Sequence, residues 1–182
     1  MPGVELAVAA GSDPGPVQLG GRWLFDGYHS ADGFEPVTAG GWFDTGDAGF
    51  VHDGELYVVG RRDEVLSLAG RNVFAEDIES VTHDACGQRV GACAAFRSGT
   101  QSARFGLVAE ANPRLVRDLD GASELARVIQ ASVVDALRTR LAPVLVTRLG
   151  VIPRTTSGKV QRAQCRSLVA TGEISRRVLA EL

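Results

Sequence analysis

Apolar residues follow two different patterns along the chain, and the first pattern covers residues 1–60. There the apolar residues form short runs separated by Gly and Pro, such as "VELAVAA", "VQLGGRWLF" and "GFVHDGELYVVG". Runs of this kind predict strands joined by turns. In "VHDGELYVV" the pair Asp53-Gly54 lies between apolar flanks, which is the signal of a two-residue β-hairpin turn. We expect no strong helix before residue 73, and therefore a small all-β region.

After "GRRDE" the pattern alternates between helices and strands. It predicts a short helix in "FAEDIESVTHDA", strands in "RVGACAAFR", "RFGLVAEA" and "PVLVTRLGVI", and a last helix over about 162–170. The longest predicted helix covers residues 123–141, where apolar residues recur every four positions as Leu125, Ile129, Val133, Leu137 and Leu141. The resulting order of elements indicates a compact α+β module with helices packed on a small sheet. The change of pattern places a candidate domain boundary near residues 60–63.

Composition restricts the class of protein. With 182 residues, 45% of them hydrophobic, the chain is long enough for one ordinary domain or a small domain with part of a second. A net charge of -3 and a pI near 5.6 argue against general nucleic-acid binding, which needs a basic face. The sequence has no apolar run of about 18 residues and no basic segment before its first apolar run, so we expect no membrane span, no signal peptide and a cytoplasmic location.

The three cysteines, Cys86, Cys93 and Cys165, are odd in number and lack CxxC spacing. This usage is typical of free thiols in a reducing compartment. A metal site on His83, Cys86 and Cys93 is conceivable, but fewer than four ligands without a recognisable spacing favour ordinary buried residues. We therefore expect no metal ligands in this chain.

The stretch "PRTTSGKVQR", residues 153–162, places Lys159 on a loop of small polar residues. The loop is either a solvated basic turn or a carrier that brings a cation to a phosphate. A Walker A loop is excluded, because Pro153 and Val160 occupy the positions where that motif needs Gly and Ser or Thr. A lysine on such a loop can still reach a phosphate as a point charge.

Three further residues are candidates for a binding site. Asp47, in a turn flanked by glycines, has a carboxylate suited to accept two hydrogen bonds from a vicinal diol such as a ribose. Arg61 follows the predicted hairpin and could contact the same ligand. Taken singly, each is more commonly an ordinary surface charge. Gly70 interrupts an apolar strand, which suggests a close backbone approach or a turn with positive φ, or else a plain loop before a helix.

In their sequence and order, these motifs resemble those of the C-terminal part of the adenylate-forming ligases. This family includes acyl-CoA synthetases, fatty acyl-AMP ligases and nonribosomal adenylation domains. The segment "GGRWLFDGYH" resembles the family's G-x-x-x-x-x-GY segment, and "GWFDTGDAG" resembles its W-x-x-TGD motif. Further along, "GRRDEVLSLAGRNVFAEDIE" resembles its GR-x-D…G…IE motif, and "PRTTSGKVQR" its closing P-[RK]-T-x-SGK-x-x-R motif. Together these segments run through nearly the whole chain in the family's order.

The resemblance implies a role for each candidate residue. Asp47 would bind the ribose hydroxyls of ATP, and Arg61 would assist at the nucleotide. Asp63 falls on the hinge between the large domain and a mobile C-terminal domain. Gly70 falls on the loop that lines the tunnel for a pantetheine thiol. Lys159 falls on the catalytic lysine, which would bridge the substrate carboxylate and the α-phosphate.

The resemblance also implies an organisation. Residues 1–62 would be the last β subdomain of the family's large domain, and residues 63–182 the mobile α+β domain that carries the lysine loop. The family's phosphate loop, acyl pocket and acidic magnesium ligand belong to a large N-terminal portion that this sequence does not contain. We therefore expect an excised fragment or one subunit of a split enzyme, with ATP and magnesium as cofactors and the N-terminal portion as its partner.

Two segments of the sequence point to different branches of the family. "GRNVFAEDIE" resembles fatty acyl-AMP ligases most, which implies an acyl carrier protein as the acceptor of the acyl group. Asp63 departs from the lysine expected at that hinge position and is the commoner choice in CoA ligases, so an acyl-CoA synthetase remains the alternative. A rival of another class is a non-catalytic module that docks a carrier protein or partner. The joint presence of Asp47, Arg61 and Lys159 speaks against that rival.

Overall fold

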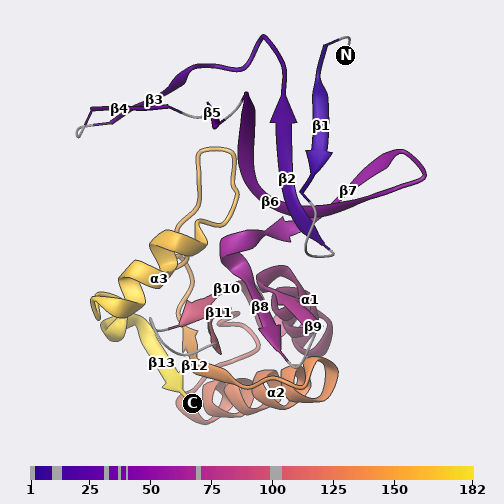
Figure 1. Ribbon diagram of the computed structural model, residues 1–182. Coiled ribbons are helices and arrows are strands. Elements are labelled where there is room, and N and C mark those ends of the chain that lie inside the picture. The colour runs from indigo at the N-terminus through magenta and orange to yellow at the C-terminus, as the bar shows by residue number, and fades with distance from the viewer. Residues whose placement is uncertain are drawn as a thin grey trace. The chain divides into compact units, whose positions relative to one another are not determined.

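The computed structural model describes residues 3–9, 14–30, 33–36, 38–39, 41–68, 71–98 and 104–182. Contacts between residues divide the chain into two units, Met1–Asp63 and Glu64–Leu182. We call the first the β unit and the second the α/β unit (Figure 1). No helix in the described ranges is both long enough and apolar enough to cross a membrane.

The β unit is built around one antiparallel sheet with the order β1-β2-β6-β5, in which β7 also pairs with β6. Its strands are β1 (Glu5–Val8), β2 (Gly15–Gly20), β5 (Thr38–Ala39), β6 (Trp42–His52) and β7 (Glu55–Arg61). A separate hairpin joins β3 (Gly27–Ser30) to β4 (Gly33–Pro36). The described residues before position 73 contain no α-helix, only a 3₁₀ turn at Arg62–Glu64, as the sequence predicts.

The predicted hairpin at Asp53-Gly54 is confirmed. Strands β6 and β7 pair from Asp47↔Arg61 to His52↔Glu55, and the two turn residues have φ angles of 51° and 81°. Positive φ at both central positions is what a type I′ turn requires, and Asp and Gly tolerate it.

The α/β unit has a four-stranded sheet of order β10-β11-β12-β13. Strands β11 and β12 are parallel and are joined by the crossover helix α2, while the other neighbouring pairs are antiparallel. The elements of the unit are β8 (Val65–Leu68), β9 (Arg71–Phe74), α1 (Ala75–Cys86), β10 (Val90–Ser98), β11 (Arg104–Ala111), α2 (Leu119–Leu137), β12 (Leu141–Thr147), α3 (Arg162–Ala170) and β13 (Val178–Glu181). This arrangement confirms the predicted α+β class.

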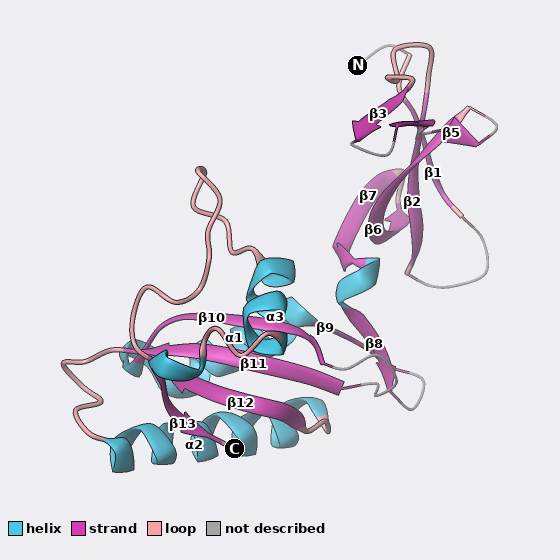
Figure 2. Ribbon diagram, turned by 90° about the vertical axis from the view of Figure 1, so that its left-hand side faces the viewer, coloured by secondary structure: helices cyan, strands magenta, loops and turns pink. Residues whose placement is uncertain are grey.

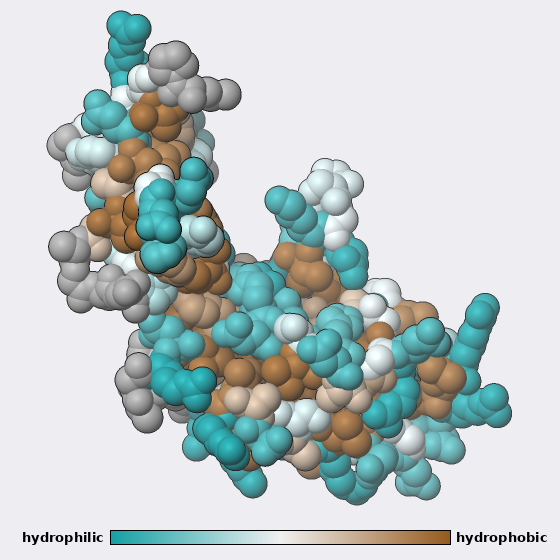
Figure 3. All heavy atoms as spheres, turned by 90° about the vertical axis from the view of Figure 1, so that its right-hand side faces the viewer, coloured by the Kyte–Doolittle hydropathy of each residue, from teal (hydrophilic) through white to brown (hydrophobic). Residues whose placement is uncertain are grey.

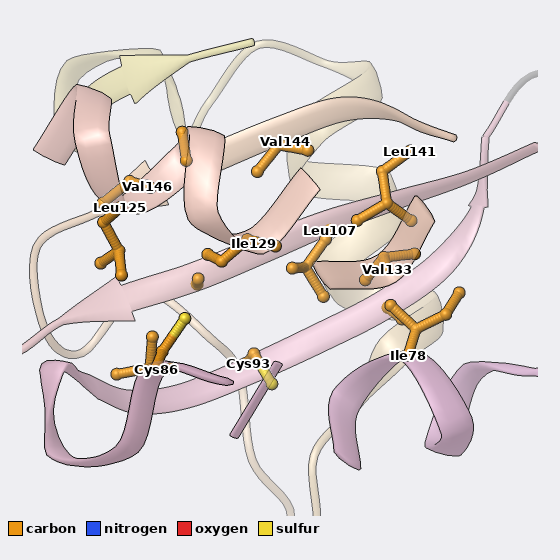
Figure 4. Packing of buried hydrophobic residues seen from close by; sticks show 14 of the residues in the cluster. Ile78, Cys86, Cys93, Leu107, Leu125, Ile129, Val133, Leu141, Val144 and Val146 are labelled. Carbon is orange, nitrogen blue, oxygen red and sulfur yellow. The ribbon is translucent and has the colours of Figure 1, made fainter. Parts of the chain in front are cut away.

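Helices cover both faces of this sheet, with α2 and α3 on opposite sides (Figure 2). On one face, Ile78 of α1 and Ile129 of α2 pack against Leu107 and Val144 of the sheet in one buried cluster (Figure 4). On the other face, Cys165 of α3 belongs to a second cluster with alternate sheet residues such as Ala94 and Val108. The period of two along each strand therefore divides its side chains between two cores.

The longest helix is displaced from its predicted range. Helix α2 begins at Leu119 rather than residue 123, because Asp118 caps it and accepts a hydrogen bond from the Gly121 N–H at 2.7 Å. It ends at Leu137, because Arg138 adopts a left-handed conformation with φ of 55°. Leu141, the last member of the predicted apolar stripe, instead opens β12. Strand β13 and the β8–β9 hairpin were not predicted.

Candidate active site

Asp47 and Arg61 lie directly opposite each other on β6 and β7. The Arg61 Nη1 atom is 3.3 Å from Asp47 Oδ1 and donates to the Thr45 carbonyl oxygen at 2.9 Å. Its Nε atom is 3.6 Å from Asp63 Oδ1. The structure thus brings three of the candidate residues together in the β unit. Asp47 lies within a strand, however, and not in the predicted turn.

The backbone before Asp47 is shaped to receive the Arg61 side chain. Gly46 has a φ of 76°, and a Cβ atom there would lie 2.8 Å from Arg61 Nη2. A side chain at this position would both strain the backbone and displace the guanidinium. Glycine therefore lets Arg61 lie against the backbone of β6.

Two neighbouring side chains fix the same segment. The Thr45 hydroxyl donates to the Val17 carbonyl at 3.0 Å and accepts from the Asp47 N–H at 3.1 Å. Asp44 accepts from the Gly46 N–H at 2.9 Å and pairs with Arg62 at 2.6 Å. The Asp47 side chain remains 32% exposed, and within the described ranges its Oδ2 atom makes no hydrogen bond. Asp47 is thus held in place with acceptor capacity left for a ligand.

The loop of Lys159 is an ordered hairpin in the α/β unit. The Thr155 N–H donates to the Lys159 carbonyl at 2.8 Å, and the Gln161 N–H donates to the Pro153 carbonyl at 2.9 Å. Gly158 has a φ of 84° with open space around it, so a turn conformation, and not a close approach, favours glycine there. Lys159 is exposed, and no carboxylate among the described residues pairs with it. It is also the only lysine in the sequence.

A buried carboxylate fixes the chain at the start of this loop. Glu110 of β11 is 7% exposed and accepts hydrogen bonds from the Val151 and Ile152 N–H groups at 2.6 and 2.8 Å. These two residues directly precede the loop. Glu110 therefore satisfies two backbone donors that would otherwise be buried without a partner.

A guanidinium fixes the other end. Arg162, the first residue of α3, forms two hydrogen bonds with Glu79 of α1, at 2.8 and 2.7 Å. It also lies 2.7 Å from a carboxylate oxygen of Glu64 and 2.7 Å from one of Glu76. The paired, hydrogen-bonded Glu79 raises the pKa of Arg162 above its ordinary value, so the guanidinium stays charged. We call these four residues the Arg162 clamp.

The candidate residues are thus divided between the units. Asp47, Arg61 and Asp63 belong to the β unit and Lys159 to the α/β unit, whereas Gly70 lies outside the described residues. Within the described ranges, no group of three or more His, Cys, Asp or Glu side chains could hold a metal ion. Cys86 and Cys93 are buried free thiols.

Sequence reasoning missed the residues that hold the candidates in place. Glu110 and Glu79 could have been noticed, since each is an acidic residue within an element whose other inward positions are mostly apolar. Such a residue is commonly retained to satisfy buried donors. Their partners could not be read from the chain, because they lie 16 to 83 residues away in sequence, from the Ala95 N–H to the Arg162 side chain for Glu79.

Comparison with known proteins shows which proteins this chain is similar to in sequence. No protein-family model matches the chain. It is 34% identical over 162 residues to a Mycobacterium tuberculosis protein named as the ligase Rv1013, an alignment that covers 85% of this chain and 29% of that protein. It is 35% identical over 129 residues to a Mycobacterium leprae protein named as the fatty-acid–CoA ligase FadD21, covering 69% of this chain and 22% of that protein.

Solved structures agree with these relatives. A structure of fatty acyl-adenylate ligases from E. coli and L. pneumophila matches with a TM-score of 0.69 and 26% identity, over 95% of this chain and 31% of that chain. The chain matches the C-terminal part of the adenylate-forming ligases. The McyG A-PCP structure complexed with phenylalanyl-adenylate has the same fold, with a TM-score of 0.76 at 22% identity over 96% of this chain and 29% of that one. The chain spans 22 to 29% of the length of the curated relatives named above.

Proposed function

We propose that this chain is the C-terminal portion of an ATP-dependent ligase that activates a carboxylic acid as acyl-AMP and passes the acyl group to a phosphopantetheine thiol. On this proposal the β unit is the end of the ligase's large domain and the α/β unit its mobile domain. The remaining part of the large domain, on the same or another polypeptide, would supply the acyl pocket.

One observation carries the proposal. A supported carboxylate and guanidinium, Asp47 and Arg61, lie 3.3 Å apart in one unit. A single exposed ammonium, Lys159, is held on an ordered loop in the other unit. Asp47 has the acceptor capacity for ribose hydroxyls. A lysine without a carboxylate partner among the described residues is available to an anionic substrate.

In the first half-reaction, a carboxylate oxygen of the acid attacks the α-phosphorus of ATP. The bond from that phosphorus to the bridging oxygen breaks, and pyrophosphate leaves with the electron pair. Negative charge grows on the phosphoryl oxygens during the transfer, and a cation placed there stabilises the transition state. We assign this role to Lys159, while Asp47 and Arg61 hold the nucleotide.

In the second half-reaction, the thiol sulfur attacks the acyl carbon. The bond from that carbon to the phosphate oxygen breaks, AMP leaves with the electron pair, and the thiol proton passes to solvent. Negative charge develops on the acyl oxygen and on the departing phosphate in this step, and we assign Lys159 no role in it. We propose that the α/β unit turns about Asp63 between the two steps, so that the loop containing Gly70 replaces the Lys159 loop at the site.

Magnesium is implied by the use of ATP. In the described ranges, Asp44, Asp47 and Asp63 each lie within 4 Å of an arginine, and no metal-binding cluster is formed. These residues do not fit a magnesium site, so none of the steps above depends on the ion being held by this chain.

The test is carboxylate-dependent exchange between ATP and pyrophosphate. The 182-residue chain alone should give no exchange, because positioning of the reactants supplies much of the rate and the chain holds few of the residues that position them. Exchange should appear when the N-terminal portion is supplied. In that complex Lys159→Ala should slow exchange by about 10²–10³, whereas Arg166→Gln, which removes an exposed charge from α3, should leave it unchanged. Robust exchange by the chain alone would mean that the site is assigned wrongly.

The identity of the thiol tests the branch of the family. Relatives named as fatty-acid–CoA ligases and a neighbour that is a fatty acyl-adenylate ligase leave both acceptors open. We propose a carrier protein, from the "GRNVFAEDIE" segment. The complex should load a phosphopantetheinylated carrier protein and barely react with free CoA; efficient acyl-CoA formation would reassign it. Carrier binding without any ATP turnover would instead support the non-catalytic docking module.

A further inference from the structure

A hollow of about 650 Å³ lies in the α/β unit, and the function proposed above makes no use of it. Four of its lining residues are arginines, and its apolar lining includes Val116, Leu149 and Leu179; the arginines are Arg117, Arg148, Arg176 and Arg177. Sites for small molecules commonly measure 300 to 1,000 Å³ and combine apolar walls with a few polar groups. The hollow has the size and the lining of such a site.

The hollow lies where the parallel strands end. Strand β11 ends at Ala111, which lines the hollow, and Arg148 follows β12 directly. The connection from β11 to α2 runs past Val116 and Arg117, so the N-terminal end of that helix is close by. The carboxyl ends of parallel strands are the usual place for ligands in open sheets with crossover helices. A helix N-terminus also favours negative charge.

The positive charge of the arginines in the hollow is not paired with carboxylates of the described residues. In the described ranges, none of its four arginines lies within 4.0 Å of a carboxylate, although Arg61, Arg127 and Arg162 each do. Arg177 donates to the Leu149 carbonyl at 3.0 Å and Arg117 to the Arg114 carbonyl at 3.4 Å, which leaves most of their N–H groups available. The nearby Glu110 is occupied by backbone N–H groups, and Asp118 caps α2.

We propose that this hollow binds a phosphorylated small molecule, with its phosphate on the arginines and its apolar part against Val116, Leu149 and Leu179. A guanidinium binds phosphate oxygens through two parallel hydrogen bonds, and it does so with more geometric definition than an ammonium group. The concave shape favours a small molecule over the surface of an acidic protein. This inference does not depend on the proposed ligase activity, because every residue it uses lies in the α/β unit.

The experiment is an NMR titration of the full ¹⁵N-labelled chain with hexyl phosphate and, separately, with inorganic phosphate. Hexyl phosphate should shift the amide signals of Val116, Arg148, Leu149 and Leu179, and should bind at least several-fold more tightly than inorganic phosphate. The double variant Arg148→Gln, Arg176→Gln should weaken hexyl phosphate binding by about tenfold or more. The control Arg127→Gln, Arg166→Gln removes the same charge elsewhere and should bind like the parent chain.

Three results would overturn the proposal. Shifts confined to the Lys159 loop or to Asp47 and Arg61 would place the phosphate in the candidate active site. Equal weakening by both double variants would reduce the effect to net charge. Tighter binding of a hexaglutamate peptide than of hexyl phosphate would identify a protein-binding surface instead.

Discussion

The two units use their apolar side chains in opposite ways. The α/β unit encloses them in two clusters on either side of its sheet. In the described part of the β unit, only Val17 and Ala48 are buried hydrophobic residues. Large side chains there are exposed instead, such as Tyr28 at 57% and Val58 at 55%, and apolar residues gather on the face of the β unit seen in Figure 3.

The α/β unit thus has a hydrophobic core of its own, whereas the β unit needs another protein surface to bury its apolar side chains. Burial of apolar surface contributes roughly 25 cal/mol per Å² to folding, so the α/β unit can be stable by itself. The apolar residues on the exposed face of the β unit do not gain this stabilisation. They lie together as a patch, whereas a monomeric protein normally exposes apolar residues singly. Such a face is what the proposed large domain would bury, and without that domain it favours self-association.

The largest expected effect concerns the Arg162 clamp of the α/β unit. Arg162→Gln would leave Glu79, whose side chain is 15% exposed, without its guanidinium. Breaking a buried ion pair on one side costs about 3–5 kcal/mol, so the free energy of unfolding of this unit should fall by that amount. Urea denaturation followed by far-UV circular dichroism measures it. Arg127→Gln, which removes an exposed pair on α2, should cost under about 1 kcal/mol; equal losses would contradict the assigned importance of the clamp.

The next effect concerns the boundary between the units. Asp63 lies in the 3₁₀ turn Arg62–Glu64, and proline there would disfavour the helical conformation of Arg62. In the complete enzyme we expect Asp63→Pro to slow one half-reaction by roughly 10²-fold, since misplacement of reacting groups has effects of this size. The other half-reaction should survive. Asp63→Ala is the control, and unchanged rates for both half-reactions in the proline variant would place the hinge elsewhere.

A third prediction compares the stability of the units directly. Both tryptophans, Trp23 and Trp42, lie in the β unit, whereas the helices lie in the α/β unit. Tryptophan fluorescence should therefore report an earlier unfolding transition in urea than circular dichroism at 222 nm. We expect the midpoints to differ by roughly 1 M, equivalent to about 1–3 kcal/mol. Coincident transitions would mean that the chain unfolds as one cooperative body.

The smallest effect concerns pH. Burial raises the pKa of the Cys93 thiol to about 12 and that of Cys165 to about 11. Because these pKa values are higher in the folded state than the ordinary 9.0, their contribution is fully present below pH 9 and is lost as pH rises toward 12. Between pH 8 and 10 the circular dichroism transition should lose about 1 kcal/mol per thiol, and Cys93→Ala should reduce this slope. The fluorescence transition should not share it, because the β unit contains no cysteine.

The sequence predicted correctly those features that depend on residues close together in the chain. The Asp53-Gly54 turn and the range of β11 follow from local pattern alone, and the motifs fixed the order of the candidate residues. The contacts of Arg162 with Glu64 and Glu79 join residues 98 and 83 positions apart, and no local pattern specifies such pairs. The predicted end of α2 was wrong because Leu141 continues the spacing of four after the helix has ended at Leu137. The spacing of apolar residues alone does not show where a helix ends.

The single lysine has a practical consequence. The other 18 of the 19 Lys and Arg residues are arginines, so amine-reactive reagents have one side-chain target in this sequence. A fluorophore or photo-crosslinker attached through that amine would mark the tip of the hairpin between β12 and α3 without any engineered cysteine. Energy transfer from Trp23 and Trp42 would then report the distance between the two units when nucleotide binds, before any step that needs the ammonium charge of Lys159. A crosslink would identify, by mass spectrometry, the polypeptide that the lysine reaches.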